Sequence, residues 1–115
     1  MSSTTVPPVD LSYLQEYTDG DEEVMNELID VFQETALEGM DDFKKGIHEA
    51  EMTIWKAAAH KLKGAAGYVG AHHLKALCSK AEAMPPTPAE DRAIFFQKIE
   101  LSYKAVHQFL EERKA

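Results

Sequence analysis

The 115-residue sequence has one cysteine and no long apolar run. Because a single cysteine, Cys78, cannot form an internal disulfide, the composition agrees with a reducing compartment. No apolar stretch approaches the roughly 20 residues that a membrane-spanning helix needs. Residues 1–9 lack the basic start and the apolar segment of a signal peptide, so we expect them to form a short disordered arm. These absences predict a cytoplasmic protein without a membrane span.

Positive charge is also scarce. Lys and Arg number 12 against 20 Asp and Glu, which gives a formal net charge of −8. This balance argues against nucleic-acid binding, because binding to phosphates needs a positive surface. Residues 52–81 are the exception, with five lysines and no acidic residue. Such a local basic field suits a small anion or an acidic protein surface as a partner.

Strand-like alternation is absent as well, and apolar residues recur three or four positions apart. This periodicity predicts a short helix capped by Asp10 that ends near Gly20, and a long helix from Asp21 to about His48. Three further helices are predicted over Met52–Tyr68, between Gly70 and Pro85, and from Thr87 to a frayed end at Glu111–Ala115. Together they predict an all-α antiparallel four-helix bundle over residues 10–115, with the short first helix across one end.

The start of the last helix carries a strong signal. Thr87 supplies a capping hydroxyl, Pro88 takes the first helical position, and Glu90 is placed to close a capping box. Cys78 belongs to an apolar stripe and is interpreted as a small buried side chain. We assign the large aromatic side chains of the helices to the core: Phe32, Phe43, Trp55, Phe95 and Phe109.

His60 lies alone on the polar face of the helix predicted over residues 52–68. At about 100° per residue, the apolar residues of this segment fall in one stripe almost opposite His60. They are Ile54, Trp55, Ala58, Ala59, Leu62, Ala65, Ala66 and Val69. The imidazole should therefore face water. Its neighbours on the polar face are Lys56, Ala57, Lys63, Gly64 and Gly67.

The segment Ala59-His60-Lys61-Leu62-Lys63-Gly64, followed by Gly67, Gly70, Leu74, Cys78 and Glu82, resembles the histidine-containing phosphotransfer (Hpt) domain of multistep phosphorelays. Asp10, Leu11, Leu14 and the pair Gly20-Asp21 are also similar to that family. The resemblance implies that His60 is phosphorylated on Nε2 and exchanges the phosphoryl group with aspartates of response-regulator receiver domains. It also implies that Glu82, where the family often has a glutamine or another polar residue, accepts a hydrogen bond from Nδ1.

The chemistry of the residues supports the same role. Imidazole has an unperturbed pKa of about 6.5, so near neutral pH its free lone pair can attack phosphorus. Phosphoryl transfer depends mostly on alignment and on neutralising the charge of the transferred oxygens. Lys63, one turn beyond His60 on the same face, can supply that charge. Lys56 and Lys61 flank the ring and contribute to the field.

Gly64 and Gly67 are unfavourable inside a helix, where glycine loses roughly 1 kcal/mol relative to alanine. Four and seven residues beyond His60, they leave room for a second protein to approach the backbone closely. Close helix packing is the alternative explanation, and it fits Gly67 better because this residue lies near the predicted helix end. We assign a partner-binding surface to Lys56, Ala57, Lys61, Gly67 and Tyr68.

The other histidines offer no metal site, because the adjacent His72 and His73 point about 100° apart and have no cysteine or carboxylate at ligand spacing. No cofactor is predicted on this chain, and Mg²⁺ is expected at the aspartate site of the partner. The sequence has no Gly-rich phosphate loop and no room for an ATP-binding domain, which argues against kinase activity. Lys61 stands where dimeric sensor kinases typically carry an acid, so we expect a monomer.

The resemblance implies a phosphocarrier whose partners are receiver domains and a hybrid sensor histidine kinase. Its partner is expected to pack on the surface shared by the long second helix and the His60 helix. A phosphorylation-independent adaptor or inhibitor that docks a receiver or kinase domain is the alternative, and the sequence leaves it open. A small metal-dependent or acid–base enzyme is a weaker third hypothesis, because one exposed histidine without a pocket cannot assemble a site.

Overall fold

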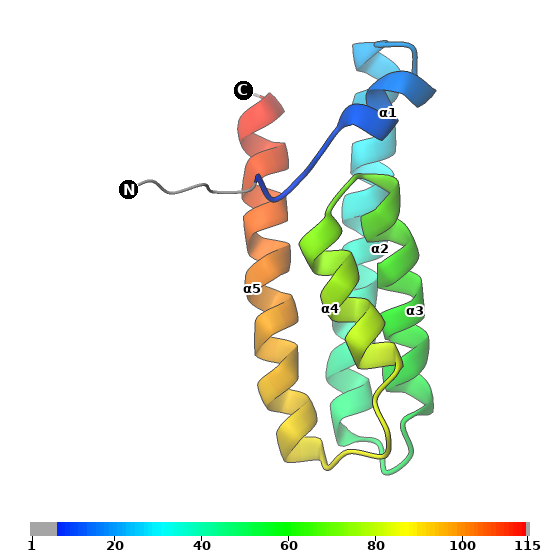
Figure 1. The fold of residues 1–115 in the computed structure, drawn as a ribbon, viewed down its shortest axis with the longest axis vertical. Helices are drawn as coiled ribbons and strands as arrows, with labels where there is room; N and C mark the ends of the chain where they lie inside the picture. Colours follow the sequence, from blue (N-terminus) through cyan, green and yellow to red (C-terminus); the bar gives the residue numbers. More distant parts are fainter. Residues whose placement is uncertain (1–6, 115) are drawn as a thin grey trace.

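The computed structural model describes residues 7–114. Regular structure in this range is entirely helical: α1 (Ser12–Tyr17), α2 (Glu22–His48), α3 (Thr53–Tyr68), α4 (His72–Glu82) and α5 (Ala89–Lys114). Helices α2 to α5 run antiparallel in chain order, and α1 lies across the end of α2 (Figure 1). The predicted all-α bundle with a short first helix is confirmed. None of the helices in this part of the chain has the length and apolarity to cross a membrane.

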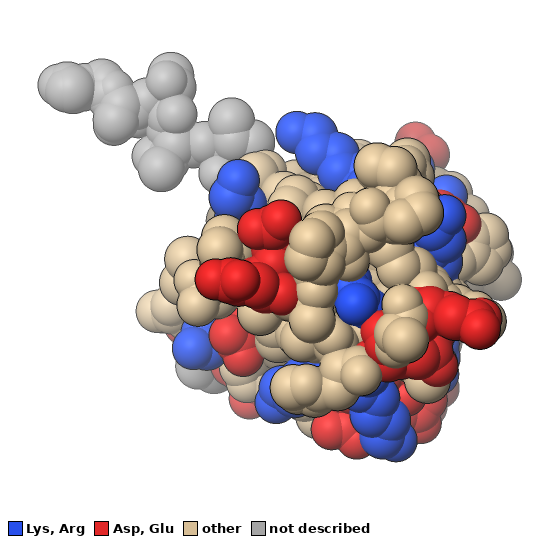
Figure 2. Space-filling view, turned by 90° about the horizontal axis from the view of Figure 1, so that it is seen from below, with Lys and Arg blue, Asp and Glu red and all other residues tan. Residues whose placement is uncertain are grey.

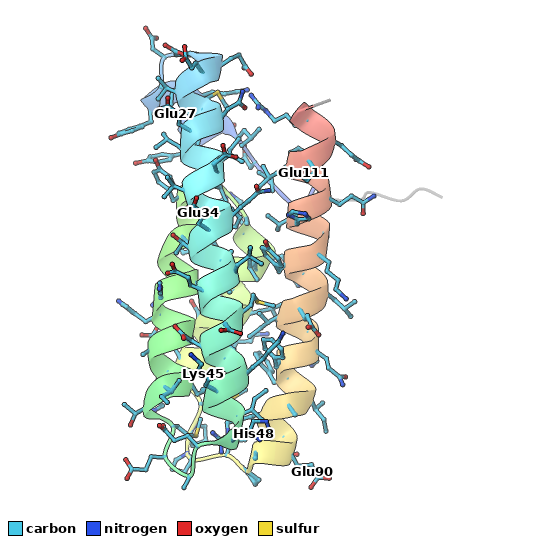
Figure 3. The ribbon with its side chains drawn as sticks, turned by 180° about the vertical axis from the view of Figure 1, so that it is seen from behind. Glu27, Glu34, Lys45, His48, Glu90 and Glu111 are labelled. Carbon is cyan, nitrogen blue, oxygen red and sulfur yellow. The ribbon has the colours of Figure 1, made fainter. Side chains whose placement is uncertain are left out.

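The two ends of α2 follow from a cap and from charges that the sequence supplies. The Asp21 carboxylate accepts a hydrogen bond from the Val24 amide at 3.2 Å and caps the first turn. Lys45 and His48 lie in the last turn, where positive charge interacts favourably with the helix dipole. Figure 3 shows the outward side of α2, with Glu27 toward its start and this basic pair at its end. The predicted length of α2 is confirmed.

The start of α5 differs from the prediction. The Thr87 hydroxyl donates to the Pro85 carbonyl at 2.6 Å and is therefore turned away from the helix. The Pro88 carbonyl accepts the first helical hydrogen bond, from the Arg92 amide at 3.0 Å. The helix accordingly begins at Ala89, one residue later than a threonine cap would place it.

The end of α5 also differs, because the helix continues to Lys114 and does not fray from Glu111. Arg113 holds this last turn against α2. Its guanidinium donates to the Glu22 carboxylate at 2.9 Å and to the Asn26 side-chain oxygen at 3.2 Å. A contact between residues 91 positions apart in the chain thus orders the turn, and no local pattern could predict it.

Three aromatic rings form the centre of the core and fix α3 in place. Phe43 of α2 meets Trp55 of α3 edge to face with ring centroids 4.9 Å apart, and it meets Phe96 of α5 at 5.7 Å. Trp55 Nε1 donates to the Ala81 carbonyl at 3.0 Å, a buried bond worth about 1 kcal/mol. Since Ala81 precedes the last residue of α4, this bond also sets the height of α4 against α3.

The core stripe of α5 departs from the prediction at two aromatic residues. Phe95 and Phe109 were assigned to the core, but both are only half-buried at its edge. Adjacent apolar pairs caused the error, because Phe95 is followed by Phe96 and Phe109 by Leu110, and periodicity alone permits either member. The side chains that α5 buries are Phe96, Ile99, Tyr103, Val106 and Leu110.

The chain before α1 packs on the link between α3 and α4. Residues 1–6 of the predicted arm lie outside the described residues, whereas Val9 is buried in the core, so an arm reaching residue 9 is too long. The Asp10 amide donates to the Gly70 carbonyl at 2.9 Å. Gly70 has a φ of +74°, and a Cβ atom there would lie 1.8 Å from the Asp10 carbonyl oxygen. Only glycine fits this position.

Alanine in place of Gly70 is expected to lower the free energy of unfolding by about 2–4 kcal/mol, because it combines a left-handed backbone conformation with a backbone clash. Urea denaturation followed by circular dichroism measures the change. Gly64→Ala is the matched control, since a Cβ atom at this helical glycine meets nothing within 4 Å. Equal stability of Gly70→Ala and the parent would contradict the packing described above.

A buried arginine closes the end of the bundle at which α3 begins. Arg92 is 3% exposed and donates to the carbonyls of Gly46 and Thr87. At Gly46 a Cβ atom would lie 2.7 Å from the Trp55 amide nitrogen, so the backbones of α2 and α3 approach each other closely here. Figure 2 views this end and shows acidic and basic side chains interspersed, with no patch of one sign. The first turn of α3 thus lies close against the end of α2.

Candidate functional site

His60 projects from the outer face of α3. Its side chain is 72% exposed, whereas the apolar stripe on the opposite face is buried at Trp55, Ala58, Ala59, Leu62 and Ala66. Ile54 and Ala65, at the two edges of the stripe, are half-buried. The predicted orientation of this helix is therefore confirmed, and the imidazole faces water.

Glu82, the last residue of α4, lies beside the ring. Its Oε2 atom is 2.8 Å from His60 Nδ1. A charged carboxylate only accepts hydrogen bonds, so this contact selects the tautomer with a proton on Nδ1. Nε2 then carries the free lone pair and has no partner within residues 7–114. The arrangement presents a nucleophilic nitrogen to solvent.

The second oxygen of Glu82 accepts a hydrogen bond from Lys63 Nζ at 2.6 Å. Both side chains of this pair are 30% exposed. The bond from Lys63, with a smaller contribution from His60, holds the pKa of Glu82 below its usual value in spite of partial burial. Glu82 is therefore charged at neutral pH. It links the His60 ring to the Lys63 ammonium group, which was predicted to neutralise the charge of the transferred phosphoryl oxygens.

Gly64 leaves the surface next to the ring open. A Cβ atom at this position would have no heavy atom within 4 Å outside its own helix turn. Gly64 lies one turn beyond His60 on the same face, so a second protein can reach the α3 backbone there. The local geometry agrees with steric access and not with close helix packing as the reason for this glycine.

Comparison with known protein families matches residues 27–112 to the Hpt domain. The chain belongs to the Hpt domain family. Histidine phosphotransfer in two-component phosphorelays is the activity that this family implies, and receiver domains are its partners. A search of curated proteins finds no match. The family match begins at Glu27, so the resemblance suggested for Asp10 to Asp21 stays a prediction.

The positive charge of the basic segment, residues 52–81, is partly neutralised in this Hpt domain. Lys61 donates to Glu38 of α2 at 2.8 Å, and this bond lowers the pKa of the Glu38 carboxyl and raises that of Lys61. Lys61 therefore points toward α2 and contributes less field at the ring than its position in the sequence suggests. Among the described lysines near the site, Lys56 and Lys75 form no ion pair.

Lys75 of α4 belongs to the exposed surface around His60, but it was not assigned there from the sequence. Its side chain would lie 3.5 Å from a Cβ atom on Gly67, so it extends across α3 on the side of the ring. The signal was present in the sequence, because Lys75 precedes Glu82 by seven residues and therefore shares its helix face. Gly67 is thus covered by a side chain, but a Cβ atom there would make only ordinary van der Waals contact with it, so close packing does not require glycine at this position.

Apolar side chains are exposed at the α1 end of the same surface. Tyr13 and Tyr17 of α1 stack with ring centroids 6.2 Å apart, and they lie close enough to Tyr68 to help burial raise its pKa. Val31 of α2 is 54% exposed. It precedes Glu38 by two helical turns, so it lies on the side of α2 that faces α3. The sequence alone did not identify these exposed residues.

The remaining candidate groups do not form a second site. Burial raises the pKa of Cys78 to about 12, so its thiol is protonated and unreactive at neutral pH. His72 lies 3.8 Å from the Asp10 carboxylate, and both side chains are exposed. No group of three or more metal-ligating side chains occurs between residues 7 and 114.

Proposed function

We propose that this Hpt domain is a phosphorelay intermediate that accepts a phosphoryl group on His60 Nε2 from a receiver-domain aspartate and passes it to another receiver domain. One observation carries the assignment. The Glu82 carboxylate, 2.8 Å from Nδ1, fixes the tautomer that exposes the Nε2 lone pair on the open face of α3. The family match supplies the class of partner.

The transfer step follows from this geometry. The Nε2 lone pair attacks the phosphorus of an aspartyl phosphate, a nitrogen–phosphorus bond forms, and the bond from phosphorus to the carboxylate oxygen breaks. The receiver regains its aspartate carboxylate. His60 keeps its Nδ1 proton, donated to Glu82, and becomes a phosphorylated imidazolium. The reverse reaction gives the phosphoryl group to the next receiver domain.

Lys63 is proposed to stabilise the charge of the transferred oxygens. It lies one turn beyond His60, and its ammonium is held by Glu82 at 2.6 Å on the same face. A lysine has three donors on a flexible stem, so Lys63 can keep one hydrogen bond to Glu82 while another reaches the phosphoryl group. Lys56, one turn before the ring, has no ion-pair partner among the described residues and adds positive charge.

The receiver domain is proposed to dock over Gly64 and along the side of α2 that faces α3. The open backbone at Gly64 admits the partner to the ring, and Ala57 and Lys61 border it toward α2. Val31 and Tyr68 supply apolar contact further along. We expect a monomeric protein that takes its phosphoryl group from a hybrid sensor histidine kinase, with Mg²⁺ required only by the aspartate site of each partner.

The chemical stability of the product tests this proposal. Receiver domains charged with [³²P]acetyl phosphate are mixed with the protein, and the label is followed on the protein after treatment with acid or alkali. We expect label that is lost in acid and retained in alkali, as for a phosphohistidine. Complex formation without any label would instead support an adaptor that docks a receiver domain, and acid-stable label would place the phosphoryl group on another residue type.

A further inference from the structure

We propose that Glu82 keeps the proton on Nδ1 of phosphorylated His60 at and above neutral pH, so that the ring leaves phosphorus as neutral imidazole. This inference deepens the proposed function and rests on it. It assigns Glu82 a part in releasing the phosphoryl group, in addition to orienting the free ring. Glu82 is a positioning residue in this role, because it touches the ring and not the phosphoryl group.

The protonation state of Nδ1 decides which form of the ring leaves phosphorus. When the nitrogen–phosphorus bond breaks, its electron pair returns to Nε2. A ring that carries a proton on Nδ1 then leaves as neutral imidazole, whereas a ring without that proton leaves as an imidazolate anion, which is far less stable. The rate at which phosphohistidine loses its phosphoryl group therefore follows the fraction of rings that carry the Nδ1 proton.

The geometry places a full negative charge where it stabilises that proton. Glu82 Oε2 lies 2.8 Å from Nδ1, within hydrogen-bond distance. A carboxylate that accepts a hydrogen bond from a protonated ring nitrogen raises the pKa of that nitrogen, typically by about one or more. If the proton left, the Nδ1 lone pair would face the carboxylate at the same distance, which is repulsive. The ring therefore keeps its proton to higher pH than an isolated phosphohistidine.

The surrounding charges do not replace this effect. Lys63 binds the far oxygen of the same carboxylate at 2.6 Å and keeps Glu82 ionised. From α2, the Glu38 carboxylate is bound to Lys61 at 2.8 Å. The charged groups that face the ring from the elements packed around it are Lys56 and Lys63 of α3, Lys75 and Glu82 of α4, and the Glu38–Lys61 pair at the edge of α2. Among residues 7–114, only Glu82 contacts Nδ1.

The Glu82→Gln variant removes the negative charge of residue 82 but keeps a side chain that can orient the His60 ring. The Glu82→Gln side chain has nearly the same shape, and its amide oxygen accepts the Nδ1 hydrogen bond, but it carries no charge. The protein is phosphorylated with phosphoramidate, which needs no partner, and the loss of phosphate from His60 is followed between pH 5 and pH 9. Water attacks phosphorus, the nitrogen–phosphorus bond breaks, and phosphate leaves with His60 restored as neutral imidazole.

We expect the pH midpoint of phosphate loss to fall by about one unit in Glu82→Gln, with about tenfold slower loss at pH 8 and equal rates at pH 5. Glu82→Asp restores the charge and should move the profile back toward that of the parent. An unchanged profile in Glu82→Gln, or the same slowing at every pH, would overturn the proposal. Failure of every variant and of the parent to take up phosphate would instead contradict the proposed function.

A measurement on the parent protein keeps the inference testable if Glu82→Gln does not fold. The ¹⁵N chemical shifts of phosphorylated His60 distinguish a protonated Nδ1 from one with a free lone pair. We expect the shift of a protonated nitrogen at pH 8. A free lone pair on Nδ1 at that pH would overturn the proposal whatever the variants do.

Discussion

Glutamine in place of His60 reduces phosphoryl acceptance to background, at least about 1,000-fold below the parent, because the amide has no nucleophilic lone pair. Docking should be preserved. His60 is 72% exposed, and glutamine offers a polar side chain of similar reach, so the dissociation constant for a receiver domain should change by no more than about threefold. Transfer of ³²P and binding by calorimetry are measured on the same preparation.

His73→Gln is the matched control for this experiment. His73 is exposed on the first turn of α4, outside the surface that carries Glu82 and Gly64. It should accept label at the parental rate. Label retained by His60→Gln would show that another residue is the acceptor, and label lost by both variants would point to a general effect on the fold. Loss of binding in His60→Gln would mean that the ring contributes to docking as well as chemistry.

Features that depend on a single helix were predicted well from the sequence. The burial of Trp55 and Leu62 and the exposure of His60 follow from 100° per residue, and the start of α2 follows from its apolar periodicity, whereas the threonine cap predicted for α5 was wrong. The side of a helix that faces the core is a local property, but it leaves open which member of an adjacent pair of large apolar residues is the more buried. In α5, Phe95 and Phe96 form such a pair, and there the assignment of Phe95 to the core was wrong.

Contacts between helices could not be predicted in the same way. Arg113 orders the end of α5 through Glu22, and Lys61 turns toward Glu38, because α2 lies beside both. The sequence placed Lys61 near the ring but did not reveal its partner. Glu82 was named only through the family resemblance, since its distance from His60 depends on the height of α4 against α3. Trp55 sets that height through its bond to the α4 backbone.

A bulky side chain at position 64 is expected to block phosphoryl transfer without weakening the fold. The space next to Gly64 is open, so glutamine can be accommodated in the free protein. Glutamine is also a better helix former than glycine, and we expect the free energy of unfolding to rise by up to about 1 kcal/mol. In the complex, however, the added side chain occupies the approach to the ring. A displacement of the phosphorus by 1 Å costs about 100-fold in rate, so transfer should fall by that factor or more.

The Gly64→Ala variant separates the effect on the stability of the fold from the effect on the partner's access to His60. A single methyl group raises helix stability at least as much as glutamine does, but it extends little from the backbone, and transfer should stay within about tenfold of the parent. Single-turnover transfer from a labelled receiver domain gives the rates, and urea denaturation gives the stabilities. Equal transfer by Gly64→Gln and the parent would mean that the partner reaches His60 without crossing position 64. The approach would then have to come from the side of α4, over Lys75 and Gly67, and the docking surface proposed on α2 would be wrong.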